Sequence, residues 1–240
     1  MSKLALLGAG AALLLSAAPV SAVTIFADFT PVSTQPNIQY SGTVAGDGTI
    51  TDMGQLVHFS FLNPDGTPGG TSFDAMMTLN AITGAGTSVG GLAILPVISG
   101  TITFTALSSV SWGGHSGTNL LSVAFTGGSF TSLLNGSTAT YGNSTPPNVV
   151  NFTSDFLDFT GSTARDMALA VNAINPPVGT LFGGGRIHTG SVSGNFGADI
   201  SSGTPQDVPE PASWALMLGG FGLAGAVLRS QRRRTEVSFG

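Results

Sequence analysis

The stretch TITFTAL, residues 101–107, alternates between two kinds of side chain over its first six positions. Threonines stand at positions 101, 103 and 105, and apolar side chains stand between them at positions 102, 104 and 106. Successive side chains of a β-strand point to opposite faces, so this alternation is typical of a strand with one buried face. The stretch therefore predicts a half-buried strand and indicates a sheet protein.

Similar short stretches occur along most of residues 23–200, separated by glycine, asparagine, proline and serine. The sequence NPDG at 63–66 predicts a turn, and Gly127-Gly128 predicts a hairpin between the strands on either side. Many short strands with turns between them predict an all-β fold for this region, an antiparallel, jelly-roll-like β-sandwich. The expected strands cover residues 24–29, 38–44, 55–62, 72–82, 92–98, 101–107, 120–125, 129–134, 149–159, 167–174 and 186–200.

One stretch inside this region also has helical character. Residues 163–173, TARDMALAVNA, contain alanine and leucine, which favour a helix. Residues 168–174 can equally form a strand, and their neighbours resemble strands. We therefore expect a strand here.

Composition limits the class of function. The 240 residues are enough for one domain, or two at most, and 42% of them are hydrophobic, which suffices for a core. There is no cysteine, so disulfides and thiolate chemistry are excluded. Between residues 23 and 210 two arginines stand against eleven acidic residues, a net charge of −9. Nucleic acid is not an expected partner, because binding phosphates requires clustered basic residues.

The N-terminus has the features of a secretory signal peptide over residues 1–22. Lys3 gives a positive start, and residues 4–18 form an almost unbroken apolar run. Val20, Ser21 and Ala22 provide small residues before a cleavage site. We expect cleavage between Ala22 and Val23, and export of the chain.

The C-terminus carries a second segment of unusual composition. Residues 201–208 are rich in serine, glycine and proline and read as a linker. Residues 214–228 carry no charge, and as a transmembrane helix they would be about 22 Å long, a marginal span for a hydrocarbon core of about 30 Å. Trp214 suits the membrane interface, and the arginines that follow suit the cytoplasmic side as a stop-transfer signal. These arginines are Arg229, Arg232, Arg233 and Arg234.

The tripeptide Pro209-Glu210-Pro211, Trp214 with Ala215, the apolar run and the arginine cluster together resemble the PEP-CTERM sorting signal, over residues 209–234. The resemblance implies a partner, an exosortase, which is a membrane-embedded cysteine protease or transpeptidase. It implies cutting near the tripeptide after transient insertion in the inner membrane, N-terminus out and C-terminus in. Pro209, Glu210, Pro211 and Trp214 are the expected recognition residues. The two prolines keep the backbone extended, as a protease cleft requires.

The remaining residues offer little chemistry of their own. His58, His115 and His188 have no metal-ligand spacing, so no metal and no cofactor are expected. Asp155 and Asp158, three apart in an expected strand, would face opposite sides and would not act as a carboxylate pair. No D-x-D-x-D-G calcium loop is present, although loop carboxylates leave calcium open.

The expected function is that of an exported, non-catalytic protein of the cell surface or of an extracellular, exopolysaccharide-rich biofilm matrix. One alternative is a carbohydrate-binding module acting on exopolysaccharide. Trp112 and Tyr141 are the candidate ligand contacts for that alternative, because sugar binders stack exposed aromatic rings on the sugar. A weaker alternative is a secreted hydrolase, which would need a histidine close to both a serine and an aspartate.

Overall fold

A computed structural model describes residues 23–43, 46–62, 68–145, 148–179 and 186–199. The signal peptide, the turn at 63–66, the linker, the sorting signal and its transmembrane helix lie outside the described residues. Within the described ranges, no helix is long and apolar enough to cross a membrane.

Thirteen β-strands make up the regular structure of the described residues. They are β1 (Thr24–Pro31), β2 (Ile38–Gly42), β3 (Gly48–Asp52), β4 (Leu56–Leu62), β5 (Pro68–Thr83), β6 (Thr87–Val89), β7 (Leu92–Trp112), β8 (His115–Thr126), β9 (Ser129–Leu133), β10 (Ala139–Thr145), β11 (Val149–Thr153), β12 (Arg165–Asn175) and β13 (Ile187–Ala198).

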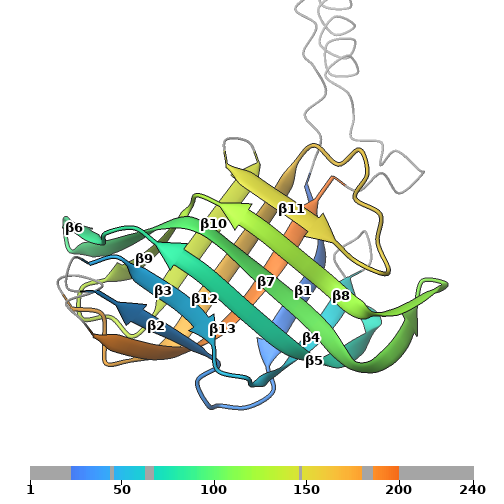
Figure 1. Cartoon of the computed structure of the whole chain (residues 1–240), viewed down its shortest axis with the longest axis horizontal. Coiled ribbons are helices and arrows are strands. Elements are labelled where there is room, and N and C mark those ends of the chain that lie inside the picture. The colour runs from blue at the N-terminus through green and yellow to red at the C-terminus, as the bar shows by residue number, and fades with distance from the viewer. Residues whose placement is uncertain (1–22, 44–45, 63–67, 146–147, 180–185, 200–240) are drawn as a thin grey trace, which may run out of the picture. The chain divides into compact units, whose positions relative to one another are not determined.

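The strands form one antiparallel sheet that folds back on itself into two layers (Figure 1). Strands β2, β3, β5, β7, β8 and β11 lie in the nearer layer of Figure 1, and β1, β4, β10, β12 and β13 lie behind them. The predicted all-β, antiparallel fold is confirmed. The layers are not the two separate sheets of a sandwich, because β9 joins β7 to β10 on one side, while β1–β4 and β2–β3 join β13 to β5 on the other.

The stretch 101–107 lies in the middle of β7. Ile102, Phe104 and Ala106 are buried, and the threonines between them point away from the core, as the alternation predicts. The expected strands 92–98 and 101–107 are one strand of 21 residues, without a break at Gly100. A Cβ atom at Gly100 would overlap the Phe125 ring, so this glycine is needed for close packing between strands and does not end one.

The predicted hairpin at Gly127-Gly128 is wrong. The strands β8 and β9 do exist on either side of it, but they do not pair with each other. Both pair with β7, one after the other along the same edge, with Thr126 opposite Ser99 and Ser129 opposite Pro96. Both glycines have positive φ, 80° and 77°, which lets the chain bend between two strands that continue in nearly the same line.

Residues 165–173 of the ambiguous stretch lie in β12, so the strand expectation is confirmed. Here β12 lies between β10 and β13, and hydrogen bonds on both of its edges outweigh the helical preference of its alanines. The expectation of a strand over 149–159 is correct only as far as Thr153, where β11 ends.

Phenylalanine side chains fill the space between the layers. The Phe104 ring, from β7, lies against Phe29 of β1, Phe59 of β4 and Phe196 of β13, at centroid distances of 4.7, 5.0 and 5.6 Å. All four rings are fully buried. Tilted and edge-on contacts of this kind stabilise a core beyond the burial of their area.

Between the pairs β1–β4 and β2–β3 the sheet splits, and two polar side chains bridge the gap. The Asn37 amide donates to the Val192 carbonyl at 3.1 Å and accepts from the Val192 N–H at 2.7 Å. Asp52 accepts from the Leu79 N–H at 3.0 Å on the other side of the split. Asn37 is 0% exposed, so its side chain takes the place of a missing strand partner for β13.

We expect Asn37→Ala to lower the free energy of unfolding by about 2–4 kcal/mol, because it leaves the buried N–H and C=O of Val192 without partners. Urea unfolding of the variant and the parent protein measures the difference. Gln39→Ala, on the next strand with a half-buried amide, is the control and should change stability little. Equal stability of Asn37→Ala and Gln39→Ala would contradict this role.

Candidate functional site

The residues with the clearest sequence signal lie outside the described residues. They are Pro209, Glu210, Pro211, Trp214 and the four arginines, together with Ala22 at the expected signal-peptide cleavage site. Val23, on the other side of that site, is the first described residue and directly precedes β1. The roles expected for them remain predictions from the sequence.

The three histidines are in separate places. The Nδ1 atom of His58 lies 2.7 Å from the Oδ1 atom of Asp74, and both side chains are exposed. His188 is 4% exposed, and its Nδ1 lies 2.7 Å from the Pro176 carbonyl. His115 is exposed at the first position of β8, directly after the turn at Gly113-Gly114. No histidine of the described ranges contacts both a serine hydroxyl and an aspartate, and no cluster of metal-ligating residues is found there.

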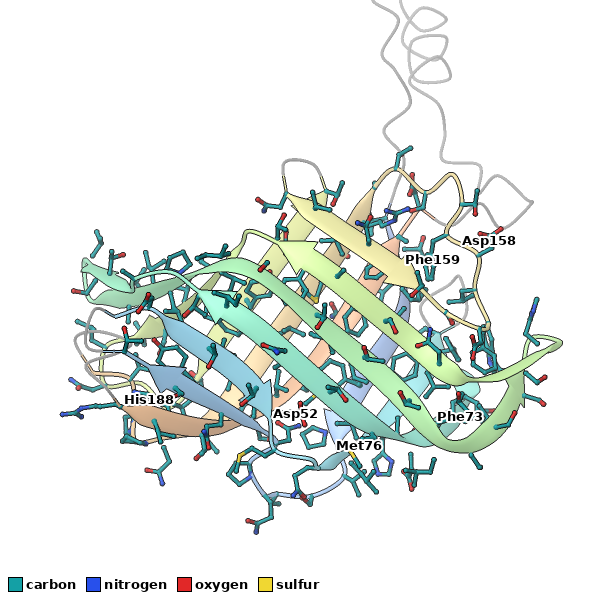
Figure 2. The ribbon with its side chains drawn as sticks, in the orientation of Figure 1. Asp52, Phe73, Met76, Asp158, Phe159 and His188 are labelled. Carbon is teal, nitrogen blue, oxygen red and sulfur yellow. The ribbon has the colours of Figure 1, made fainter. Side chains whose placement is uncertain are left out.

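Asp155 and Asp158 follow β11 in a loop and perform separate structural tasks. Asp155 accepts from the N–H groups of Thr118 and Asn119, at 2.9 and 2.8 Å, which fastens the loop to β8. Asp158 accepts from Thr160, and these hydrogen bonds lower the pKa of its carboxyl. Figure 2 shows Asp158 and His188 at opposite ends of the domain, so they cannot act together.

The two aromatic residues proposed as sugar contacts are held against the core. Tyr141 is 2% exposed, and its hydroxyl donates to the Gly127 carbonyl at 2.8 Å and accepts from Asn143. Burial raises the pKa of the Tyr141 hydroxyl. Trp112 is half-buried and stacks on Phe61 with ring centroids 4.4 Å apart. Tyr141 therefore has no free ring face for a sugar, and Trp112 has one face covered by Phe61.

A groove of about 520 Å³ lies on the outer face of the layer formed by β1, β10, β12 and β13. Its floor consists of small side chains that are direct cross-strand neighbours: Asp28 of β1 lies opposite Asn195 of β13, which lies opposite Ala168 of β12. Ala170 and Ser193 form the next row. Ligand pockets have volumes of about 300–1,000 Å³, so the groove has the size of a binding site.

Besides Tyr141, which is buried and hydrogen-bonded, five polar residues line this groove, and their side chains lie on its outer face. Among the described residues, none of them makes a hydrogen bond or ion pair through its side chain. By contrast, Asn37 and Asp155 each bind backbone groups through their side chains. The five are Asp28, Thr30, Thr140, Ser193 and Asn195.

The sequence alone does not reveal this groove. Its outward residues are small and ordinary, and each becomes informative only when the register of four strands is known. The one available signal is the run of small residues at alternate positions, Ala168 and Ala170 in β12 and Ser193 and Asn195 in β13.

A second, much smaller hollow of about 40 Å³ lies beside His188. Its lining is almost entirely apolar, with Tyr40, Ile50 and Ile174 among its walls. The Nε2 atom of His188 is buried and has no partner in the part of the chain that the structure describes. A space of this size holds a water molecule or two, so it is not the site of a larger ligand.

Comparison with protein families finds a PEP-CTERM protein-sorting motif at residues 207–234. The chain carries a PEP-CTERM sorting signal. The resemblance drawn from the tripeptide, the tryptophan and the arginines is thereby confirmed, with the matched range beginning two residues before Pro209. The PEP-CTERM motif indicates an exported protein that an exosortase sorts to the cell envelope or surface. No curated protein and no solved structure gives a significant match.

Burial raises the pKa of Asp166, on β12, above its ordinary value of 3.8, while the Gly197 N–H opposes the shift. An acid with a raised folded pKa binds its proton more tightly in the native state, so stability falls as the pH rises from 3.8 through the folded pKa. We expect Asp166→Asn to raise the free energy of unfolding at neutral pH, with no gain below pH 3.8. Urea unfolding across this pH range measures it.

Asp158→Asn is the control of opposite sign. Hydrogen bonds from Thr160 lower the pKa of Asp158, so its ionised form stabilises the native state above the ordinary pKa. We expect this variant to be slightly less stable than the parent at neutral pH. A stability of Asp166→Asn equal to the parent at every pH would contradict the burial effect.

Proposed function

We propose that this chain is an exported protein of the cell surface or of an extracellular, biofilm-type matrix, with no catalysis of its own. Its signal peptide directs export, and its C-terminal helix holds it transiently in the inner membrane, N-terminus out and C-terminus in. An exosortase then cuts near Pro209–Pro211 and releases or transfers the β-domain. The observation that carries the proposal is the sorting motif at residues 207–234.

The chemistry of the motif supports this sequence of events. Proline at 209 and 211 disfavours helix, so the tripeptide remains extended for a protease cleft. The uncharged run 214–228 is short for a permanent span, and four arginines after it resist transfer across the membrane. These are properties of a substrate that another enzyme recognises.

The contacts at the end of β13 also support the proposal, because they leave the cleavage region 209–211 outside the described strands. Asp199, directly after β13, accepts from the Ala164 N–H at 2.9 Å and from the Thr163 hydroxyl at 2.8 Å. The Ser162 hydroxyl contacts the same carboxylate at 2.6 Å. The last described residue is thus fastened to the loop before β12, and a cut at 209–211 removes nothing from the described strands.

A second candidate function is a carbohydrate-binding module acting on exopolysaccharide. The groove between β1 and β10 favours it, because five polar side chains in a hollow of binding-site size make no hydrogen bond or ion pair with other described residues. Burial of Tyr141 counts against the form of this alternative that relies on aromatic stacking. No observation favours the hydrolase alternative.

The intact mass of the protein recovered from outside the cell tests the leading proposal. We expect a mass that corresponds to a chain from Val23 to the region 209–211, with or without an added group. Substitution of both Pro209 and Pro211 by alanine should leave a full-length, membrane-retained form. A recovered mass that extends through Gly240 in the parent protein would show that the tail is a permanent anchor.

A further inference from the structure

We propose that the groove across β1, β13, β12 and β10 binds a neutral glycan, with Asp28 and Asn195 as its principal polar contacts. The inference deepens the second candidate function above and rests on it. It does not depend on aromatic stacking by Trp112 or Tyr141.

The five polar side chains of the groove have the chemistry that sugar hydroxyls require. An ionised aspartate accepts only, whereas an asparagine amide both donates and accepts, so an adjacent Asp and Asn can bind neighbouring hydroxyls of one ring. Asp28 and Asn195 are direct partners on paired strands, where opposite Cβ atoms are about 4.5–5.5 Å apart. Thr30, Thr140 and Ser193 add three hydroxyls along the same groove.

The apolar walls supply the other half of sugar recognition. Ile25 is 40% exposed, and Leu62 lies half-buried at the end of β4. Both line the groove beside the polar row. The carbon-bound hydrogens of a sugar ring form an apolar face that can pack on such side chains, so burial of this face adds to the hydrogen bonds.

The width of the groove fits a short stretch of a polysaccharide. The groove crosses four adjacent strands, and neighbouring strands are about 4.8 Å apart, so its floor is about 14 Å wide across β1, β13, β12 and β10. This length corresponds to roughly three sugar rings lying side by side across the strands. The small floor residues Ala168 and Ala170 leave the space open along its course.

Charge selects a neutral glycan over an acidic one. Among the described residues that line the groove, only Asp28 is charged, and its charge is negative. The region 23–210 carries a net charge of −9, and none of the described lining residues is a lysine or arginine that could attract a carboxylate or sulfate. An acidic polysaccharide would therefore be repelled at short range.

Backbone pairing argues against an extended peptide as the occupant. A peptide that binds by strand addition needs a free sheet edge. The groove lies on the face of the sheet, where β13 is paired with β12 on one edge and with β1 and β2 on the other. The side chains, and not the backbone, are available to a ligand here.

The test is titration of the processed protein, as recovered from outside the cell, with neutral hexasaccharides: cellohexaose, laminarihexaose and maltohexaose. A hexamer of galacturonate is the acidic comparison. We expect at least one neutral oligosaccharide to bind and the acidic one to bind at least tenfold more weakly, by calorimetry. Failure of all three neutral oligosaccharides to bind, or tighter binding of the acidic one, would overturn the proposal.

Variants locate the binding. We expect Asp28→Asn to weaken binding about tenfold or more and Asn195→Ala about three- to tenfold, because a hydrogen bond to a charged group is stronger than a neutral one. We expect Ala168→Trp to weaken binding about tenfold or more, because its side chain would fill the groove. The matched controls lie on the opposite layer: Ala124→Trp at an exposed position of β8, and Asn80→Ala at an exposed position of β5. These should bind like the parent protein.

The variants also separate misfolding from loss of the site. Asp28→Asn preserves the shape of the side chain, so a loss of binding with unchanged thermal unfolding assigns the effect to the groove. Equal loss in Ala168→Trp and Ala124→Trp, or unchanged binding in all three groove variants, would overturn the proposal. The mass of the same sample reports on sorting independently, so failure of the groove and failure of the exosortase proposal give different results.

Discussion

Contact of Phe104 with Phe29, Phe59 and Phe196 is the interaction on which the rest of the domain depends. It joins the middle of β7 to three strands of the other layer, and so fixes which face of each strand is inside. A shift of one residue in any of these strands would turn its phenylalanine to solvent. Because the inner face is fixed in this way, the outer residues that line the groove, such as Asp28 and Asn195, are fixed as well.

The alternation of apolar residues was enough to predict the all-β fold, because a strand with one buried face has an apolar residue at every second position. It located β7 from residues 101–107 and β12 from residues 167–174. It could not predict partners. Gly127 and Gly128 resemble a hairpin turn locally, yet β8 and β9 continue along one edge of β7, since pairing is decided by residues distant in the sequence. The unbroken passage of β7 through Gly100 depends on the Phe125 ring in the same way.

The candidate sites differ in how far the sequence alone could reveal them. A sorting signal is read by another protein from a continuous segment, so its tripeptide, apolar run and arginines are visible without a fold, and the family comparison finds the motif at 207–234. A groove is assembled from single residues of several strands. Tyr141 was a reasonable sugar contact by residue type, but its place on the inner face of β10 buries it. Asp28 and Asn195 carried no signal until the register placed them side by side.

The path of the chain out of the domain has a mechanical consequence. The last described strand, β13, is hydrogen-bonded along both edges, and Asp199 fastens its end to the loop before β12. A pull on Asp199 along the axis of β13 would load the bonds on both edges of this strand. The backbone hydrogen bonds on both edges of β13 would then bear the load together, in shear. They would not open one after another from one end of the strand. A domain held at Asp199 and loaded along β13 would therefore resist the force through backbone hydrogen bonds on both edges of this strand.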